Sequence, residues 1–317
     1  MAAARPLLVV VTGPTGSGKS ELALQLADYL TPRVAVEIVS ADSAQVYRGM
    51  DIGTAKPSRQ VRERIPHHLI DIRKPTESFS AGEFVREARL AIDAILARGH
   101  LPLLVGGTML YLRALHDGLA ELPAASTAVR GEIDAKAGRL GWPALHAELA
   151  RVDPAAAAHI ASNDAQRIQR ALEVYRLTGV PISQWQQRTH GARDEFRWLR
   201  YALLPASRAE LRLRLASRFE DMLRAGLVDE VRTLQARGDL TERHPSMRAV
   251  GYRQLWRFCR GDCSLEQATQ QALIATMQLA KRQMTWLRRE QGMKELTAPS
   301  DAQAASIGAA IEGGGAV

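Results

Sequence analysis

The sequence predicts an α/β fold, a parallel sheet flanked by helices with an all-helical domain inserted into it. Short apolar runs alternate with helical patterns up to about residue 115, as expected for strands joined by crossover helices. Strand patterns then disappear between residues 116 and 198, where Gly and Pro break short helical segments. One more apolar run and two long amphipathic segments follow. The sheet domain is therefore expected to resume after the insertion.

Each predicted strand and helix rests on a pattern of apolar residues in the sequence. The strands are short runs rich in Val, Leu and Ile, expected at Leu7–Val11, Val34–Val39, Leu101–Val105 and Trp198–Leu204. Two amphipathic helices are expected at Glu210–Arg237 and Leu265–Arg289. The predicted domains are a first part of the sheet domain at 1–115, a helical insertion at 116–198, and a second part at 199–296. Residues 297–317, rich in Ala, Gly and Ser, are predicted to be disordered.

A phosphate-binding loop lies between the first predicted strand and a helical pattern in which Leu22, Leu26 and Leu30 recur every fourth residue. It matches G-x-x-x-x-G-K-[S/T] and consists of Gly13, Pro14, Thr15, Gly16, Ser17, Gly18, Lys19 and Ser20. Backbone N–H groups and the positive end of the helix dipole converge on an anion in such a loop. Lys19 adds a charge, and Ser20 is the expected ligand of Mg²⁺. The fold is thus expected to be P-loop NTPase-like, with Mg²⁺ as cofactor.

The composition bounds the class of protein. A chain of 317 residues with 46% hydrophobic residues can bury a large core. The first apolar run is too short for a membrane span and leads directly into the phosphate loop, so a cytoplasmic protein without a membrane anchor is expected. Cys259 and Cys263 have no further Cys or His nearby in the sequence, which favours reduced thiols over a zinc site or a disulfide framework.

The net charge of +8 is unevenly distributed. Residues 1–150 carry 17 basic and 16 acidic side chains, whereas residues 151–290 carry 24 and 15. A basic half beside a neutral phosphate-binding half indicates a polyanion partner. Because Arg outnumbers Lys 36 to 6, as in chains encoded by GC-rich genes, the composition by itself leaves nucleic-acid binding open.

Asp42 follows the second predicted strand, at the sheet edge that carries the phosphate loop. Its carboxylate is a candidate general base. Two other interpretations stay open: a cap of the following turn, or a Mg²⁺ ligand of the Walker B type. Elsewhere no apolar strand ends in the Asp-Glu pair of an ATPase, and no Arg-rich lid of a nucleoside monophosphate kinase is evident, which disfavours phosphoryl transfer.

Six blocks, in order between about Leu7 and Arg289, resemble the tRNA dimethylallyltransferase family. They are the phosphate loop, DSAQVYRGMDIGTAKP at 42–57, PHHLID at 66–71, NDAQRIQR at 163–170, RAVGYR at 248–253 and KRQMTWLR at 281–288. One departure is Met109, which stands where the family pattern Gly-Gly-Thr-Gly-Leu-Tyr has Gly, after Thr108. This difference bears on the shape of that loop.

The resemblance implies transfer of a dimethylallyl group from dimethylallyl diphosphate to N6 of adenosine 37, in tRNAs that read codons beginning with U. Asp42 would then be the base, and Thr108 would bind the diphosphate or the adenine, with a turn-capping hydroxyl as the alternative. Arg214 or Arg218 would reach the reaction centre, and Arg218 is favoured; pairing with a nearby acid is the alternative. The partner would be the anticodon arm of tRNA, bound by a monomer.

The resemblance also implies a set of tRNA-binding residues. Apart from Asp42, they are Ser43, Ala44, Gln45, Arg130, Gln166, Arg167, Ile168, Gln169, Arg170, Arg248, Ala249, Val250, Gly251, Tyr252, Arg253, Lys281, Arg282, Gln283, Met284, Thr285, Trp286, Leu287 and Arg288. A merely solvated helix face is the alternative for the segment at 166–170. A small-molecule P-loop kinase, an isopentenyltransferase acting on free AMP or ADP, and a non-catalytic RNA-binding protein each account for less of the chain.

Overall fold

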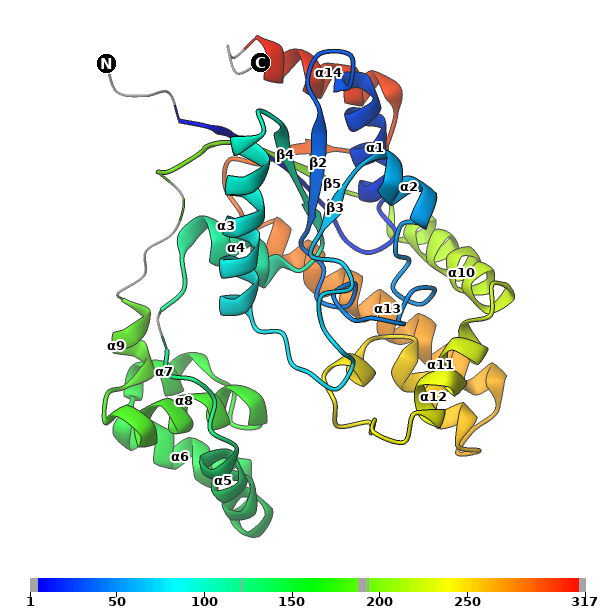
Figure 1. Ribbon diagram of the computed structural model, residues 1–317. Helices are drawn as coiled ribbons and strands as arrows, with labels where there is room; N and C mark the ends of the chain where they lie inside the picture. The colour runs from blue at the N-terminus through cyan, green and yellow to red at the C-terminus, as the bar shows by residue number, and fades with distance from the viewer. Residues whose placement is uncertain (1–4, 121, 188–191, 193, 314–317) are drawn as a thin grey trace. The chain divides into compact units, whose positions relative to one another are not determined.

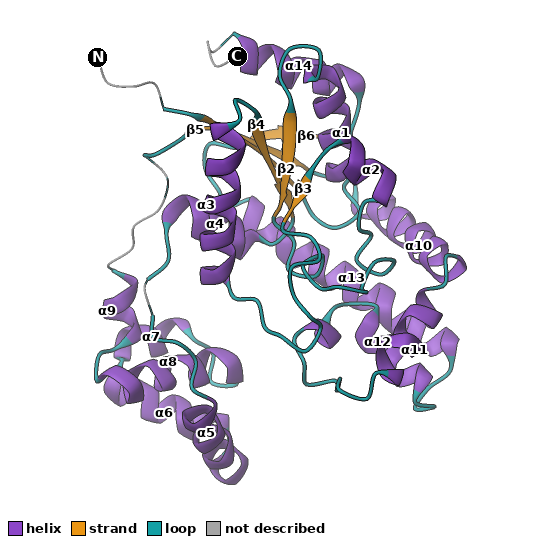
Figure 2. Cartoon of the chain, viewed as in Figure 1, coloured by secondary structure: helices purple, strands orange, loops and turns teal. Residues whose placement is uncertain are grey.

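The computed structural model describes residues 5–120, 122–187, 192 and 194–313, which divide into two compact units. The first, the sheet unit, comprises residues 1–114 and 193–317; the second, the helical unit, comprises Leu115–Ala192. Figure 1 labels their elements, and Figure 2 shows in orange the strands of the sheet unit. The predicted α/β class with a parallel sheet is confirmed.

The described strands of the sheet unit form one parallel sheet in the order β3-β2-β4-β1-β5-β6. The strands are β1 (Leu7–Thr12), β2 (Val36–Ser40), β3 (His67–His68), β4 (Leu101–Gly106), β5 (Arg197–Leu203) and β6 (Lys294–Leu296). All four predicted strands are present with ends shifted by one or two residues. The two edge strands were not predicted because two or three residues are too short to produce a pattern.

Helices cover the sheet and extend beyond it. In the sheet unit they are α1 (Lys19–Leu30), α2 (Arg59–Arg64), α3 (Ala81–Ala97), α4 (Met109–Asp117, which ends in the helical unit), α10 (Arg208–Arg224), α11 (Leu227–Ala236), the 3₁₀ turn η1 (Ser246–Arg248), α12 (Tyr252–Cys259), α13 (Leu265–Leu287) and α14 (Asp301–Glu312). The helix predicted at Glu210–Arg237 is two helices, because Gly226 takes a left-handed φ of 98° between them. No described helix has the length and apolar character needed to cross a membrane.

The main core lies between the sheet and two helices, α1 and α14. Alternate residues of β1, Leu7, Val9 and Val11, pack with Leu22 and Leu26 of α1. The intervening residues of the strand are buried on the other face, and α3 packs against β2 and β4. Because both faces are covered, the strands are continuous apolar runs.

The predicted disordered tail is wrong, since residues 301–312 form α14. Ser300 caps the helix, and Ala304, Ile307 and Ile311 are buried against α1. Gly308 makes close packing possible, because a Cβ there would lie 2.3 Å from a ring carbon of Tyr29. Small residues allow this helix to approach α1 closely, so few large apolar side chains are needed.

The helical unit has its own core. Its helices are α5 (Thr127–Leu140), α6 (Trp142–Val152), α7 (Pro154–His159), α8 (Ala165–Thr178) and α9 (Ile182–Gln186). Its core contains Ile133, Leu145, Leu149, Ile168 and Leu172. The predicted end of the insertion at 198 is too late, because the unit ends at Ala192 and β5 begins at Arg197.

Candidate active site

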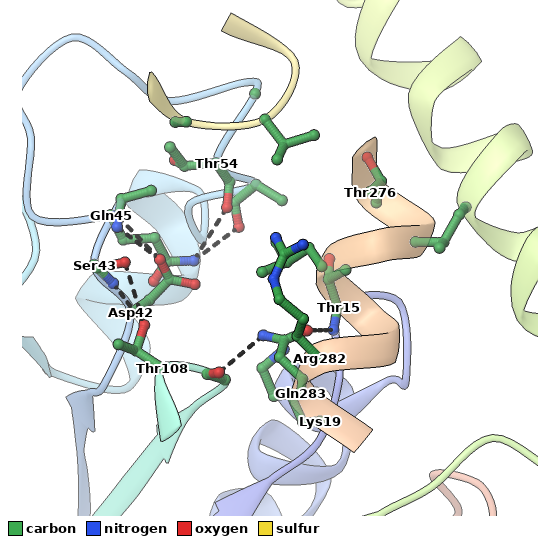
Figure 3. Close-up of a pocket in the computed structure, with 18 of the residues that line it drawn as sticks. Thr15, Lys19, Asp42, Ser43, Gln45, Thr54, Thr108, Thr276, Arg282 and Gln283 are labelled. Atoms are coloured by element: carbon green, nitrogen blue, oxygen red, sulfur yellow. Dashed lines mark hydrogen bonds between the residues drawn. The ribbon is translucent and has the colours of Figure 1, made fainter. Parts of the chain in front are cut away.

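A pocket of about 700 Å³ opens at the carboxyl ends of β1, β2 and β4, within the sheet unit. The segments after these strands supply Lys19, at the start of α1, and Asp42 and Thr108 to its lining, and α10 and α13 supply further side chains. Figure 3 shows side chains from these elements around the pocket. The structure therefore brings together the phosphate loop, Asp42 and Thr108, which were predicted from the sequence as site residues.

The phosphate loop is built for an anion. Gly16 and Gly18 take φ values of 77° and 91°, the left-handed conformation that favours glycine. Burial lowers the pKa of Lys19 to about 8, although the nearby carboxylate of Asp42 raises it; the guanidinium of Arg218 lowers it further. A desolvated cation whose charge is disfavoured gains most from a bound anion. The loop thus supports binding of a phosphate or diphosphate.

Asp42 has two roles in this geometry. Its Oδ1 accepts hydrogen bonds from the backbone N–H groups of Ala44 at 2.8 Å and Gln45 at 3.4 Å, so it caps the turn after β2. The same carboxylate acts electrostatically on Lys19 and on Arg218, whose pKa is lowered by burial and raised by Asp42. The capping interpretation therefore holds for Oδ1, while the carboxyl group still faces the cationic part of the pocket.

Thr108 connects two of the loops. Its Oγ1 accepts a hydrogen bond of 3.0 Å from the backbone N–H of Ser43 and lies 3.3 Å from that residue's hydroxyl. Its own N–H donates to the carbonyl of Ala41. The turn-capping alternative is thus observed for this hydroxyl. The next residue, Met109, is 5% exposed, and its Sδ lies 3.7 Å from the Thr12 hydroxyl, so it packs against the end of β1.

Of the two arginines considered on α10, Arg218 lines the pocket and Arg214 pairs with Glu210 at 2.5 Å. Of the two, Arg218 is therefore the one that lies at the pocket, and its role there stays a prediction. Beside it the pocket wall is apolar, which suits a hydrocarbon chain next to a diphosphate. That wall is formed by Leu215, Phe219, Met222, Leu279 and Trp286.

Gln283 of α13 is a site residue whose role was not predicted. Its Oε1 accepts a hydrogen bond of 2.9 Å from the backbone N–H of Thr15, and its Nε2 donates to the carbonyl of Gly107 at 2.8 Å. Figure 3 shows the amide between the two loops. It was expected to contact tRNA, and instead its amide holds two loops of the pocket together. One Gln on an amphipathic helix leaves no pattern that indicates such a contact.

The predicted tRNA-binding blocks of the sheet unit divide by burial. Their pocket-lining members, besides Gln283, are Ser43, Ala44, Gln45, Arg248, Ala249, Val250, Arg282 and Trp286. Arg253, Lys281, Thr285 and Arg288 are exposed, and Gly251 is buried. Tyr252, Met284 and Leu287 are at most 8% exposed. The expectation that these three side chains contact tRNA is corrected, because they fill the core and position their neighbours.

The helical unit shows a similar division on α8. Arg167 is exposed, with Asp164 3.4 Å away, and Gln166 is exposed. Arg170 and Arg130 both bind the carboxylate of Glu173, which is fully buried. Two further residues of this helix that were predicted to bind tRNA make internal contacts instead. Ile168 is buried in the core, and Gln169 donates a hydrogen bond to Asp134 at 2.6 Å.

Comparisons with known proteins agree with this geometry. The family model described as IPP transferase matches residues 45–290. Two curated relatives named tRNA dimethylallyltransferase, from Bordetella petrii and Methylococcus capsulatus, are each 55% identical over 91% of both chains.

Solved structures are also similar. The tRNA isopentenylpyrophosphate transferase of Bacillus halodurans has a TM-score of 0.70 at 35% identity, covering 98% of this chain and 96% of its own. A eukaryotic dimethylallyltransferase described as acting on tRNA has a TM-score of 0.77 at 28% identity, covering 98% of this chain and 79% of its own.

Proposed function

The chain belongs to the IPP transferase family, and we propose that it transfers a dimethylallyl group from dimethylallyl diphosphate to N6 of adenosine 37, in tRNAs that read codons beginning with U. One observation carries the proposal most directly: Lys19 and Asp42 line the same pocket, beside an apolar wall. A cationic loop for a diphosphate, a carboxylate and a hydrocarbon surface are the three features that this reaction needs.

In the reaction, N6 of the adenine attacks C1 of the dimethylallyl group. The C1–O bond breaks, a C1–N6 bond forms, diphosphate leaves, and one proton is lost from N6. Lys19, the loop N–H groups and Arg218 stabilise the negative charge that develops on the diphosphate. Asp42 accepts the proton. Since the N6 lone pair is delocalised into the ring, a positioned base contributes roughly 10²- to 10⁴-fold to the rate.

Mg²⁺ fits this pocket as a companion of the diphosphate. Ser20 lines the pocket with an exposed side chain. In the described part of the chain, no group of three or more His, Cys, Asp or Glu side chains could hold a metal ion. An ion there would take most of its oxygen ligands from the diphosphate and water, as Mg²⁺ commonly does in phosphate sites. When bound, it would neutralise charge on the leaving diphosphate.

The acceptor base has to leave the anticodon loop to reach the sheet edge. Unpaired loop bases can be extruded for a few kcal/mol at most. Arg248 and Arg282 line the pocket, and Arg167 is exposed on the helical unit; these are the proposed phosphate contacts of the anticodon arm. We also propose that the protein acts as a monomer in the cytoplasm.

The test is mass spectrometry of nucleosides from unmodified tRNA incubated with the protein, Mg²⁺ and dimethylallyl diphosphate. The expected product is N6-dimethylallyladenosine at position 37, absent when the metal is chelated and reduced when inorganic diphosphate competes. A Lys19→Ala protein is the matched negative control. Prenylation of free AMP in place of tRNA, or phosphate release from ATP without prenyl transfer, would contradict the proposal.

A further inference from the structure

A single carboxylate, that of Glu230 on α11, binds three consecutive backbone N–H groups of another segment. Its Oε2 accepts from Asp51 and Ile52, each at 2.8 Å, and its Oε1 accepts from Gly53 at 3.3 Å. The hydroxyl of Tyr252, at the start of α12, donates to the same Oε1 at 2.5 Å. Glu230 therefore joins two segments separated by about 200 positions in the sequence.

Packing makes this junction specific. Tyr252 is fully buried. Its ring lies so close to Gly53 that a Cβ on the glycine would be 2.5 Å from a ring carbon and 2.8 Å from Leu227. Burial and the Glu230 carboxylate raise the pKa of the Tyr252 hydroxyl, which keeps it a hydrogen-bond donor at any physiological pH. Removing the Glu230 side chain would leave the buried Tyr252 hydroxyl without this acceptor.

Both joined segments are walls of the active-site pocket. Gly53, Thr54 and Ala55 line it from one segment, and Arg248, Ala249 and Val250 line it from the other. The first segment is connected further, because Gln45 Nε2 donates to the carbonyls of Thr54 at 3.3 Å and Ala55 at 3.4 Å. Gln45 is part of the turn that Asp42 caps.

The junction is separate from the phosphate loop. Among the described residues, neither Glu230 nor Tyr252 makes a hydrogen bond to residues 13–20. The loop is held instead by Gln283 and by its own backbone contacts. A change at the junction should thus move the walls around the carboxylate while leaving the diphosphate site as it is.

We propose that Glu230 and Tyr252 are positioning residues for the acceptor nucleotide: their hydrogen bond fixes the two pocket walls between which the extruded base is held against Asp42. This inference rests on the proposed function. It assigns the two side chains no contact with substrate. Their effect is on the geometry of attack, to which rates are sensitive at the scale of about 1 Å.

The test compares Tyr252→Phe and Glu230→Gln with matched controls. Tyr29→Phe removes a hydroxyl elsewhere in the sheet unit, and Asp229→Asn neutralises the exposed neighbour that pairs with Arg232. Prenyl transfer is measured in a single turnover with saturating tRNA and donor. Active sites are counted by titration with inorganic diphosphate, so a partly unfolded sample does not mimic a slow one.

The rate per active site should fall about tenfold in both junction variants, the size expected for loss of a hydrogen bond to a charged group. The dissociation constant of diphosphate should stay within about twofold of wild type in the junction variants. In the two controls, both the rate per active site and this dissociation constant should stay within the same range. The double variant should be no slower than the slower single variant, because both changes disrupt the same junction: Phe removes the hydroxyl donor, and Gln replaces one carboxylate oxygen with an N–H donor.

Two results would overturn the inference alone: a wild-type rate per active site in Tyr252→Phe, or equal losses of rate and diphosphate affinity, which would indicate a general structural role. If Glu230→Gln does not fold, the more conservative Tyr252→Phe decides the matter. Failure of the wild-type protein to prenylate tRNA would contradict the proposed function itself, and the inference with it.

Discussion

The side-chain oxygen of Gln283 accepts a hydrogen bond of 2.9 Å from the backbone N–H of Thr15, across 268 positions of sequence. The same amide donates to the carbonyl of Gly107. With the Thr15 N–H held by Gln283, the loop is fixed, and its other N–H groups can be aimed at an anion without reorganisation when the anion binds. The helix α13 thus contributes to the diphosphate site by orienting the loop.

Replacing Gln283 should weaken diphosphate binding. In Gln283→Ala the Thr15 N–H and the Gly107 carbonyl both lose a partner, and the loops lose a connection worth about 1–3 kcal/mol. The dissociation constant of inorganic diphosphate, measured by calorimetry, should rise roughly tenfold. Gln278→Ala, an exposed site on the same helix, is the control. Equal affinities in all three proteins would contradict the orienting role.

Lys19 should make donor binding depend on pH. Its folded-state pKa, about 8, lies below the ordinary 10.5, so the side chain loses its charge as the pH rises through 8. The dissociation constant of diphosphate should then increase up to about tenfold per pH unit above 8. Lys19→Met removes the titrating group and should lose this part of the dependence. Parallel pH profiles for the two proteins would show that Lys19 stays charged.

The lowered pKa of Lys19 also makes the stability of the fold depend on pH, but in the opposite direction to the affinity for diphosphate. Between pH 8 and 10.5 the unfolded chain holds a proton on Lys19 that the folded chain has released. The contribution of Lys19 to the free energy of unfolding therefore rises with pH in this window. Below pH 8 the folded chain bears the full cost of burying the charged side chain. The cost is offset when the charged Lys19 side chain binds the diphosphate.

Most of the fold was predictable from the sequence, since the four long strands are apolar runs that alternate with helical patterns. The residues that line the pocket were predictable where a local motif marks them, as in the phosphate loop and at Asp42. Glu230 was missed, and Gln283 was predicted only as a tRNA contact, because each acts through backbone groups far away in the sequence, and a single polar residue on a helix gives no signal. The helix α14 was missed because Gly308 and its alanines suggest disorder until Tyr29 is seen to pack on them.

The helix α14 should be an integral part of the core. Ile307 is 1% exposed and packs in the cluster that contains α1, so Ile307→Ala should lower the free energy of unfolding by about 2–5 kcal/mol. Ile274 is 53% exposed, and Ile274→Ala should change it by no more than about 0.5 kcal/mol. Urea denaturation of both variants makes the comparison. Equal stabilities would mean that the C-terminal helix is not docked in solution.

Arg167 should contribute to tRNA affinity through a phosphate contact. Each phosphate neutralised by a cation releases counterions, so the affinity for tRNA falls as salt rises. Arg167→Ala should make the slope of log affinity against log salt less steep by about 0.7–0.9. Arg224→Ala, an exposed arginine paired with Asp221 in the sheet unit, is the control. An unchanged slope would mean that Arg167 belongs to a solvated helix face.

Arg170 requires a different test from Arg167. Its guanidinium binds the buried carboxylate of Glu173 at 2.7 Å and the carbonyl of Pro123. Arg170→Ala should therefore destabilise the helical unit by about 1–3 kcal/mol as well as change tRNA binding. Thermal unfolding measured beside the salt series separates the two effects. If Arg170→Ala loses affinity for tRNA while its stability stays that of wild type, Arg170 contacts tRNA rather than supporting the fold through Glu173.

Asp42→Asn is the sharpest test of the chemistry, because the substitution keeps the fold. The Asn side-chain oxygen can still accept from the N–H groups of Ala44 and Gln45, so the turn remains capped. The amide cannot take the proton from N6, and turnover should fall by roughly 10²- to 10⁴-fold. The affinity for tRNA should stay close to wild type, and diphosphate binding should not weaken, since a negative charge near Lys19 is removed. Single-turnover rates at saturating substrate decide the role: a wild-type rate in Asp42→Asn would leave Asp42 as a turn cap and require another base.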